Sequence, residues 1–370
     1  MKVLYFLESF GLGGIESFVL NVLEHADQSQ NNISCCVGRM TTESFSHRIA
    51  RLKVPFYDLG NDYKGFPGMR YQKGSQRLTK FLTDNRYDIL HIHANHGVDY
   101  LWARVAKKTG VPKVVIHSHN TGVTKGRYKS VGHNLFRGAF SHYIDAYFAC
   151  SIEAAHWLLP QDIFRDRDYR LIPNGIVLDD YRFNSLERSR LRSELGIEDK
   201  FVCGHVGRFN FQKNHEFLLR AFERIHTDNP DTVLVLVGEG ELFETVRNQA
   251  YELGIINDIR FLGPRNDVNL LLSAFDVLLF PSRFEGLSVV LVEAQTAGLP
   301  IIASSSISPD TMLSSCLRTA DLDEGIWRAT FNNLRHRYDR SNEIDQRLLK
   351  FDILKSISEM DDGYKALGAI

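Results

Sequence analysis

The sequence lacks any uncharged apolar run long enough to form a membrane-spanning helix. Such a helix needs about 20 consecutive apolar residues, and no apolar stretch in the 370 residues approaches that length. The apolar start MKVLYFL ends at Glu8 and a glycine-rich turn, which is too short and wrongly flanked for a signal peptide. These absences predict a cytoplasmic protein without a transmembrane segment.

The sequence also has little net charge and no cysteine pattern typical of a zinc site. Its 44 Lys and Arg residues nearly balance its 45 Asp and Glu residues, and a net charge of -1 provides no general attraction to nucleic acid. The five cysteines are an odd number without zinc-like spacing. In a reducing compartment they would be small buried apolar residues, so we assign them no chemistry.

The length of the chain and the order of its apolar runs predict two α/β domains. A chain of 370 residues exceeds the usual size of a single core. Short β-rich runs alternate with helical patterns, which is typical of parallel sheets covered by helices. Predicted strands are residues 2–7, 33–37, 89–93, 113–117, 146–150 and 169–172, then 202–206, 232–237, 259–262, 277–280 and 301–303.

A turn and a charged helix between residues 176 and 200 separate the two series of strands. We therefore predict two doubly wound, Rossmann-like domains, residues 1–176 and 177–350, and a final helix over 351–370 that returns to the first domain. In such folds ligands bind beyond the carboxyl ends of the strands. The sequence thus predicts a central cleft lined by strand-end residues of both domains.

The second predicted domain has polar residues and glycines after several strands. Arg208 and Lys213 follow one strand and precede a helix, so both cations can face a diphosphate at the helix amino terminus. Gly238 ends the next strand, and the backbone at Leu262 and Gly263 could bind the edge of a nucleobase. The alternative for Arg208 and Lys213 is a pair of solvated surface cations, which usually contribute little.

The stretch RFEGLSVVLVEAQTAGLP carries two glutamates eight positions apart. Glu285 is expected in a loop, before a helix that begins near Gly286 or Leu287, and Glu293 about two turns inside that helix. Carboxylates accept hydroxyl hydrogen bonds, which suits sugar and ribose diols. With the two cations, the pattern favours a nucleoside diphosphate sugar. The alternative is a helix-capping Glu285 and a coincidental spacing.

The first predicted strand is followed by a glycine-rich turn that opens a helix. Gly11, Gly13 and Gly14 allow close approach of a ligand, and the helix amino terminus offers free N–H groups to an anion. The alternative is a tight strand-to-helix turn without a ligand. GLGGIE also lacks the third glycine of a dinucleotide-binding fingerprint.

Taken together, these motifs resemble the retaining glycosyltransferase family 4, which has the GT-B fold. The resemblance covers nearly the whole chain, and bacterial capsular and exopolysaccharide glycosyltransferases are the most similar in character. It implies transfer of a sugar from a UDP-linked donor to a glycan or a polyprenyl-diphosphate-linked acceptor. The matching segments are GGIE (13–16), HSHN (117–120), PNGI (173–176), GR (207–208) with Lys213, VGEGE (237–241), FLG (261–263) and FEG-x6-EAQTAGLPIIAS (284–304).

The resemblance implies roles for particular residues. Glu285 would contact hydroxyls of the donor sugar, and Glu293 would hold the ribose hydroxyls. Arg208 and Lys213 would stabilise the diphosphate as leaving group. The remaining implied contacts are the backbone of Gly286 and Leu287 with the diphosphate, Gly13 and Gly14 with the donor from the first domain, and His119 with the donor sugar.

His119 has an alternative, because a strand-end histidine can also be satisfied by the backbone. His117 lies two positions earlier and could be confused with it; the alignment of VVIHSHN favours His119.

The family implies retention at the anomeric carbon without an agreed enzymic nucleophile, and we do not assign Glu285 that role. It also implies transfer without a bound metal, and Asp166 and Asp168 lie in a charged loop rather than in a persuasive Asp-x-Asp site. Where many members have a Gly-Gly and an acidic turn, this chain reads SSISPDTMLSS. This segment departs from the family pattern at a place where many members touch the donor.

The segment 101–144 is one-sided in charge, with eight cations and no Asp or Glu. Aromatic and aliphatic residues such as Trp102, Leu135 and Phe136 are interleaved with the cations, which suits a surface lying on anionic lipid. The sequence therefore predicts peripheral binding to the inner leaflet of the membrane, where a polyprenyl-linked acceptor would reside. The alternative is a pair of solvated basic helices.

Three other functions compete with transfer. The histidines of HIHANH and HSHN (His91, His93, His96, His117 and His119) could be strand-end ligands of a metal-dependent hydrolase. A nucleotide-sugar epimerase shares the two-domain architecture, and fold alone does not settle function. A non-catalytic binding protein would require broken cleft residues, and here they are intact.

Overall fold

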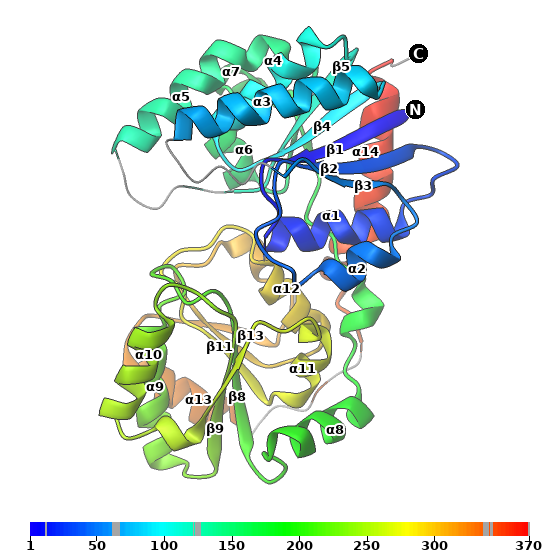
Figure 1. Cartoon of the computed structure of the whole chain (residues 1–370). Coiled ribbons are helices and arrows are strands. Elements are labelled where there is room, and N and C mark those ends of the chain that lie inside the picture. The colour runs from blue at the N-terminus through cyan, green and yellow to red at the C-terminus, as the bar shows by residue number, and fades with distance from the viewer. Residues whose placement is uncertain are drawn as a thin grey trace. The chain divides into compact units, whose positions relative to one another are not determined.

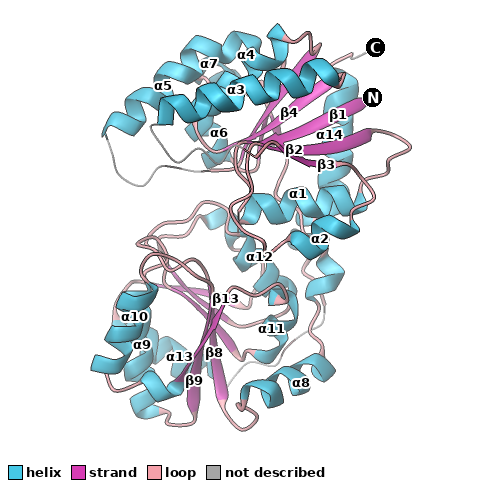
Figure 2. Ribbon diagram, viewed as in Figure 1, coloured by secondary structure: helices cyan, strands magenta, loops and turns pink. Residues whose placement is uncertain are grey.

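The chain forms two compact units, Met1–Ile176 with Lys350–Ile370 (unit 1) and Val177–Leu349 (unit 2). The computed structural model describes residues 1–11, 13–60, 67–120, 122, 127–335, 340 and 343–368, leaving aside the side chains of 67 and 127–131. Each unit is a parallel sheet with helices on both faces (Figures 1 and 2). The predicted fold class, two α/β domains with parallel sheets, is confirmed.

Unit 1 contains a seven-stranded parallel sheet with the order β3-β2-β1-β4-β5-β6-β7. The strands are β1 (Lys2–Leu7), β2 (Asn32–Val37), β3 (Phe56–Asp58), β4 (Ile89–Ala94), β5 (Lys113–Ser118), β6 (Ala146–Ala149) and β7 (Arg170–Leu171). The helices are α1 (Gly14–His25), α2 (Ser46–Arg51), α3 (Pro67–Asp84), α4 (Tyr100–Lys108), α5 (Arg127–Phe140), α6 (Ile152–Leu158), α7 (Gln161–Asp166) and α14 (Ile353–Ala366). Short 3-10 turns are η1 (Gly97–Asp99) and η2 (Ser141–Tyr143), and η6 (Gln346–Phe351) runs from the end of unit 2 into unit 1.

Alternation along the central strands of unit 1 separates two layers. Leu4 and Ile92 pack with Trp102 into an apolar core beneath α3 and α4. Tyr5 and His91 point to the opposite face, where α14 lies beside α1 (Figure 1). The last helix of the chain is therefore part of the layer that covers this face of the first sheet.

Unit 2 contains a six-stranded parallel sheet with the order β10-β9-β8-β11-β12-β13. The strands are β8 (Phe201–Val206), β9 (Thr232–Val237), β10 (Ile259–Gly263), β11 (Val277–Phe280), β12 (Ile301–Ser304) and β13 (Leu317–Ala320). The helices are α8 (Ser185–Leu195), α9 (His215–Asp228), α10 (Phe243–Glu252), α11 (Val268–Ala274), α12 (Val289–Thr296) and α13 (Glu324–Arg335). Short 3-10 turns are η3 (Leu178–Tyr181), η4 (Ile256–Asp258) and η5 (Pro309–Thr311).

The sheet of unit 2 is buried on both faces. Val233 and Val235 of β9 pack into one apolar cluster, while Leu234 and Leu236 pack into a second cluster with Trp327. A strand covered on both faces needs no polar side, which explains why the runs in this half are continuously apolar.

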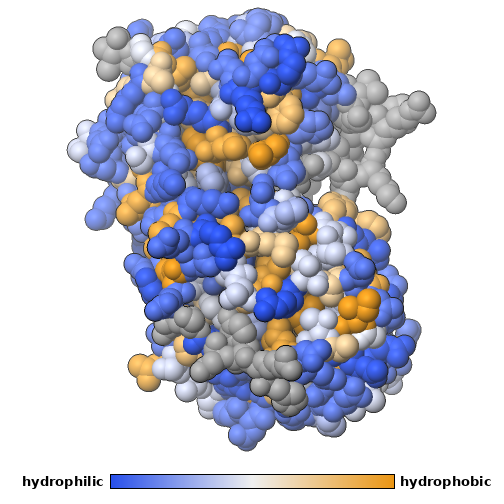
Figure 3. Space-filling view, turned by 180° about the vertical axis from the view of Figure 1, so that it is seen from behind, coloured by the Kyte–Doolittle hydropathy of each residue, from blue (hydrophilic) through white to orange (hydrophobic). Residues whose placement is uncertain are grey.

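Hydrophilic side chains predominate on the face of the molecule shown in Figure 3. Within the described part of the chain, no helix is long and apolar enough to cross a membrane.

The sequence missed two strands and misplaced one helix. β3 has three residues, and β13 reads LRTA with Arg318 and Thr319 exposed, so neither gives an apolar run that predicts a strand. The helix expected from Gly286 or Leu287 begins at Val289, with Ser288 as its N-cap. Glu293 therefore lies about one turn inside α12, not two.

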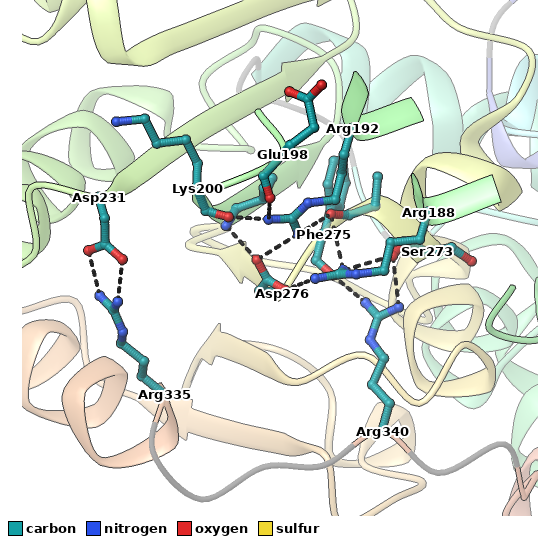
Figure 4. Close-up of polar contacts among 12 residues, drawn as sticks. Arg188, Arg192, Glu198, Lys200, Asp231, Ser273, Phe275, Asp276, Arg335 and Arg340 are labelled. Atoms are coloured by element: carbon teal, nitrogen blue, oxygen red, sulfur yellow. Dashed lines mark hydrogen bonds and ion pairs between the residues drawn. The ribbon is translucent and has the colours of Figure 1, made fainter. Parts of the chain in front are cut away.

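An arginine cluster anchors α8 at the edge of the sheet where β11 begins (Figure 4). Asp276 accepts hydrogen bonds from Arg188 and Arg192, both on α8, and from the backbone N–H of Val202. Arg188 and Arg340 also donate to backbone carbonyls of residues 272–275 at the end of α11. Cations stabilise a helix when they lie at its carboxyl terminus. The arginine cluster therefore has a structural role. It lies at the edge of the sheet opposite the carboxyl ends of the strands.

Candidate functional site

Backbone hydrogen bonds link the carboxyl ends of β8, β9 and β10 in unit 2. The Gly207 N–H donates to the carbonyl of Val237, and the Gly238 N–H donates to the carbonyl of Gly263. Gly238 has a φ of 137°, and a Cβ there would lie 2.1 Å from the Gly207 carbonyl oxygen. A side chain would force these strand ends apart, so glycine is required at position 238.

The structure brings Lys213 and Glu285 together. Lys213 Nζ lies 2.7 Å from Glu285 Oε1, and the two side chains are 14% and 8% exposed. The ammonium group also lies 4.5 Å from the centre of the Phe280 ring. Two backbone contacts hold the loop that carries Glu285. The Arg283 N–H donates to the Gln212 carbonyl, and Glu285 forms an isolated parallel β-bridge with Ile307. A carboxylate and an ammonium group are thus fixed at one point beyond β8 and β11.

Arg208 does not join this buried pair. Its side chain is 70% exposed and forms a long ion pair with Glu241, 3.6 Å from Arg208 Nε to Glu241 Oε2. The two cations that the sequence presented as equivalent therefore differ in environment. Arg208 matches the solvated alternative, whereas Lys213 does not.

Glu293 is held by a tyrosine that the sequence reading did not single out. Its side chain is buried, and the Tyr181 hydroxyl donates to Glu293 Oε1 at 2.7 Å. Burial raises the pKa of Glu293 to about 7, and the hydrogen bond from Tyr181 opposes that rise. Tyr181 ends η3, the short turn at the start of unit 2. Glu293 can thus gain or lose a proton near neutral pH.

Two backbone segments that the sequence assigned to donor binding lie at strand and helix ends. The pairing of β10 with β9 shifts register between Phe261 and Gly263, which places Leu262 in a bulge outside the regular ladder. Bulges often occur next to functional sites because they redirect the backbone. Gly286 and Leu287 precede Ser288, which provides no side-chain cap to α12. The first N–H groups of α12 therefore have no capping side chain at this residue.

The glycine-rich turn of unit 1 carries an internal carboxylate. Gly13 is the N-cap of α1, which begins at Gly14. Glu16 Oε1 accepts a hydrogen bond from the Gly11 N–H at 3.0 Å, and a Cβ on Gly13 would lie 2.6 Å from Glu16 Oε2. The fourth residue of GGIE therefore lies close to the N–H groups that the sequence assigned to an anion. The sequence did not indicate that the Glu16 carboxylate is a hydrogen-bond acceptor within this turn.

His119 lies at the end of β5 with both ring nitrogens engaged inside unit 1. Its Nδ1 is 2.7 Å from Asn174 Oδ1, and its Nε2 is 2.9 Å from His93 Nδ1. Burial lowers the pKa of His119 to about 4, so the ring is neutral at physiological pH. Asn174 belongs to PNGI, a motif that the sequence showed without indicating its partner. The role of His119 toward a donor sugar stays a prediction.

The basic segment 101–144 is less one-sided in the structure than in the sequence. Lys107 pairs with Asp145 at 2.7 Å, one residue beyond the segment, and Arg137 donates to the carbonyls of Trp157 and Leu159. Trp102 is buried in the core, so its expected place at the surface is wrong. Leu135 is 66% exposed. Lys125 lies outside the described residues, as do the side chains of Arg127, Tyr128 and Lys129.

The histidines of the hydrolase alternative do not form one cluster. His96 precedes η1, where its side chain and Asp99 form a capping box. One ring nitrogen from each of His91, His93 and His117 lies within 4.8 Å of the other two. These three residues are buried, which leaves no open face for a substrate of a hydrolase.

Comparison with known proteins identifies the family of the chain. Residues 12–180 match the family model described as Glycosyltransferase Family 4, and residues 187–314 match that described as Glycosyl transferases group 1. EpsF of Bacillus subtilis (strain 168), which its name describes as a glycosyltransferase, is 30% identical over 310 residues, covering 83% of this chain and 80% of EpsF. The chain belongs to glycosyltransferase family 4.

Other relatives and solved structures place this family 4 glycosyltransferase among GT-B proteins. The UDP-Gal:alpha-D-GlcNAc-diphosphoundecaprenol alpha-1,3-galactosyltransferase of Escherichia coli is 31% identical over 235 residues, 62% of this chain and 60% of that protein. HepE of Anabaena, solved in complex with UDP-glucose, superposes with a TM-score of 0.77 at 19% identity, covering 99% of this chain and 100% of HepE. Sucrose-phosphate synthase of Thermosynechococcus elongatus has the same TM-score at 15% identity, covering 100% of this chain and 99% of that one. The GT-B fold and the glycosyltransferase activity predicted from the motifs are confirmed.

Proposed function

We propose that this enzyme transfers a sugar, with retention of anomeric configuration, from a UDP-linked donor to a lipid-linked oligosaccharide or glycan during surface polysaccharide synthesis. The observation that carries the proposal is the buried Lys213–Glu285 pair beside the amino terminus of α12. It combines a cation and helix N–H groups for a diphosphate with a carboxylate for sugar hydroxyls. The names of the E. coli relative, which contains UDP-Gal and a diphosphoundecaprenol acceptor, and of HepE with UDP-glucose support the substrate classes.

The chain's own residues suffice for the proposed leaving-group chemistry. Lys213, the backbone of Gly286 and Leu287, and the first N–H groups of α12 would stabilise the departing UDP, with Arg208 as a more exposed contributor. The acceptor hydroxyl would attack on the face that UDP leaves and give its proton to the diphosphate. This path needs neither a carboxylate nucleophile nor a metal ion at the diphosphate.

Glu293 would hold the ribose hydroxyls, and the bulged backbone at Leu262 and Gly263 would contact the uracil edge above Gly238. Gly13 and Gly14 of unit 1 would contribute N–H groups to the donor, next to the Glu16 carboxylate that accepts from the Gly11 N–H. These roles follow the family pattern, and the positions of the groups within each unit support them.

The reaction can be tested with a panel of UDP- and GDP-linked sugars and a polyprenyl-diphosphate-linked glycan acceptor. We expect one UDP-sugar to stabilise the protein in a thermal shift assay and to yield a product whose anomeric configuration, read by NMR, equals that of the donor. An inverted product would contradict retention. Conversion of the donor sugar without any acceptor would favour the epimerase alternative, which also has a GT-B structural relative.

We also propose that unit 1 binds the anionic inner leaflet of the membrane through segment 101–144, where the acceptor would lie. Exposed Lys108 and Leu135 support this, whereas the internal partners of Lys107 and Arg137 argue against a contribution from those two cations. In the same assay, the acceptor is presented in anionic or in zwitterionic vesicles. Two results would exclude this docking. One is equal vesicle binding and equal transfer with anionic and with zwitterionic vesicles. The other is unchanged vesicle binding after Lys125, Arg127 and Lys129 are changed together to alanine.

Binding of UDP is expected to become about tenfold tighter as pH rises from 6 to 8, because the ionised form of Glu293 accepts the ribose hydroxyls and its pKa is about 7. The folding stability of the protein without UDP depends on pH with the opposite sign. The pKa of Glu293 in the folded protein lies above the ordinary value of 4.5 for a glutamate, so ionisation of Glu293 costs stability as pH rises from 4.5 toward 7. Calorimetric titration of UDP across this range measures the effect.

Two variants serve as controls for this pH dependence. Tyr181→Phe removes a hydrogen bond that lowers the Glu293 pKa, so the midpoint should move to higher pH. Glu293→Gln should bind UDP weakly at every pH in the range. An unchanged pH profile in Glu293→Gln would assign the dependence to another group.

A further inference from the structure

Four histidines form a stack on the face of the unit 1 sheet that α1 and α14 cover. His91 and His93 lie on β4, and His117 and His119 lie on and just after β5. The rings of His91 and His93 are 4.4 Å apart, and those of His117 and His119 are 4.1 Å apart. Phe18 of α1 and Tyr364 of α14 contact the stack from the helical side. Glycosyl transfer as proposed uses none of His91, His93 and His117.

A hydrogen-bond chain from Asn174 fixes the tautomer of His93. Asn174 Oδ1 is an acceptor, so the neutral His119 ring must donate from Nδ1 and keep a lone pair on Nε2. That lone pair requires the neighbouring nitrogen, His93 Nδ1 at 2.9 Å, to be the donor. His93 Nε2 is then a bare lone pair, and it is buried without a hydrogen-bond partner among the described residues.

A second chain fixes the tautomer of His91 in the same way. The Met360 sulfur has no proton, so the Tyr5 hydroxyl donates to it and accepts from the Tyr364 hydroxyl at 3.1 Å. The Tyr364 oxygen is thus free to accept from His91 Nδ1, 2.5 Å away. His91 Nε2 is then also a bare lone pair, which is buried and has no hydrogen-bond partner in the described part of the chain. Two independent chains leave two histidines with the same nitrogen unsatisfied.

His117 completes the group. Within the residues that the structure describes, neither ring nitrogen of His117 has a partner in hydrogen-bond geometry, although the backbone of Ile172 lies close to the ring. Burial lowers the pKa of His117 well below the usual range, and the Ile172 backbone opposes that shift only weakly, so the ring is neutral. Buried polar nitrogens without partners are costly, and a cluster of them requires an explanation.

We propose that His91, His93 and His117 bind a divalent transition-metal ion, with zinc as the expected occupant. Three neutral imidazoles are a ligand set that zinc accepts, and the hydrogen bonds from Nδ1 of His91 and His93 match the outer contacts that orient metal-binding histidines. Hard cations such as Mg²⁺ and Ca²⁺ prefer oxygen ligands and are excluded by the all-nitrogen set.

Binding requires a small contraction of the cluster. One ring nitrogen from each of the three histidines lies within 4.8 Å of the other two. Zinc–nitrogen bonds of about 2.1 Å in tetrahedral geometry bring the ligand nitrogens to about 3.4 Å from one another. A water or hydroxide would take the fourth position, and hydroxide would lower the charge of the buried site. Because the residues are fully buried, the ion would enter as the chain folds. It would join β4 to β5 and hold His93 in the tautomer that donates to His119.

The test is the metal content of the full chain, produced in zinc-supplemented medium and purified without a metal-affinity step. Mass spectrometry of the elements should find about one zinc per wild-type chain. His117→Gln should lose it. The matched control is His215→Gln in unit 2, because His215 is also buried with two unpartnered ring nitrogens but lies outside the cluster, and this variant should keep the zinc.

A second measurement covers the case in which His117→Gln fails to fold. Wild-type protein unfolded in chelator and refolded with equimolar Co²⁺ should develop the visible absorption of tetrahedral cobalt. The proposal would be overturned if wild-type protein contained no zinc and showed no cobalt absorption. A buried water would then be the partner of these nitrogens. Zinc retained by a folded His117→Gln would also overturn it, because the ion would then lie elsewhere.

Discussion

Changing Glu285 to alanine is expected to lower kcat/KM for transfer by about 10²- to 10³-fold, the usual cost of removing a positioned polar group from a reacting centre. Glu285 is proposed to bind donor hydroxyls, and it holds Lys213 at 2.7 Å. Its removal also leaves a nearly buried ammonium unpaired, which costs about 3 kcal/mol of stability. Steady-state kinetics with the identified donor, together with thermal unfolding, measure both effects.

Two variants separate these effects. Glu285→Gln keeps a hydrogen-bonding side chain of the same size but removes the charge, so we expect most of the loss in activity with a smaller loss in stability. Glu187→Ala breaks an exposed ion pair on α8, between Glu187 and Arg190 at 2.8 Å, and should leave both quantities nearly unchanged. Full activity of Glu285→Ala would return the glutamate to a capping role and remove the main support for the proposed donor site.

The sequence was informative wherever a local pattern decides structure. Apolar runs of four to six residues predicted most strands, because a parallel strand buried on both faces must be continuously apolar. The eight-residue spacing of Glu285 and Glu293, with the surrounding motifs, indicated the family that EpsF and the family models confirm. Segments such as β13, which are short and partly exposed, carry no such pattern.

The sequence was less informative about which polar groups meet. Arg208 and Lys213 follow the same strand, yet one is exposed and the other is paired with a carboxylate 72 positions away. Trp102 looked like a membrane contact because its neighbours are basic, but helical periodicity turns it into the core. Tautomers of the histidine stack depend on Asn174, Met360 and Tyr364, which are distant in sequence. Such partners follow from tertiary structure alone.

The difference between the two cations leads to the second large effect. Lys213→Met is expected to lower kcat by about 10²- to 10³-fold, because a cation in a site shielded from water stabilises a leaving diphosphate far more than a solvated one does. Methionine keeps an apolar side chain of similar length while removing the ammonium group that lies over the Phe280 ring. Arg208→Ala should cost about tenfold or less, since its guanidinium is largely exposed and screened. Single-turnover kinetics at saturating donor isolate the chemical step from donor binding.

The comparison of the two variants also tests whether the Arg208 side chain contacts the diphosphate of a bound donor. If Arg208 turned toward the diphosphate when UDP-sugar binds, its removal would cost as much as that of Lys213, and the ranking from exposure would be wrong. Raising the salt concentration distinguishes the two cases without a variant, because an exposed cation loses most of its effect at high ionic strength and a buried one does not. A transfer rate that resists salt, falls steeply in Lys213→Met and changes little in Arg208→Ala would assign leaving-group stabilisation to the buried lysine.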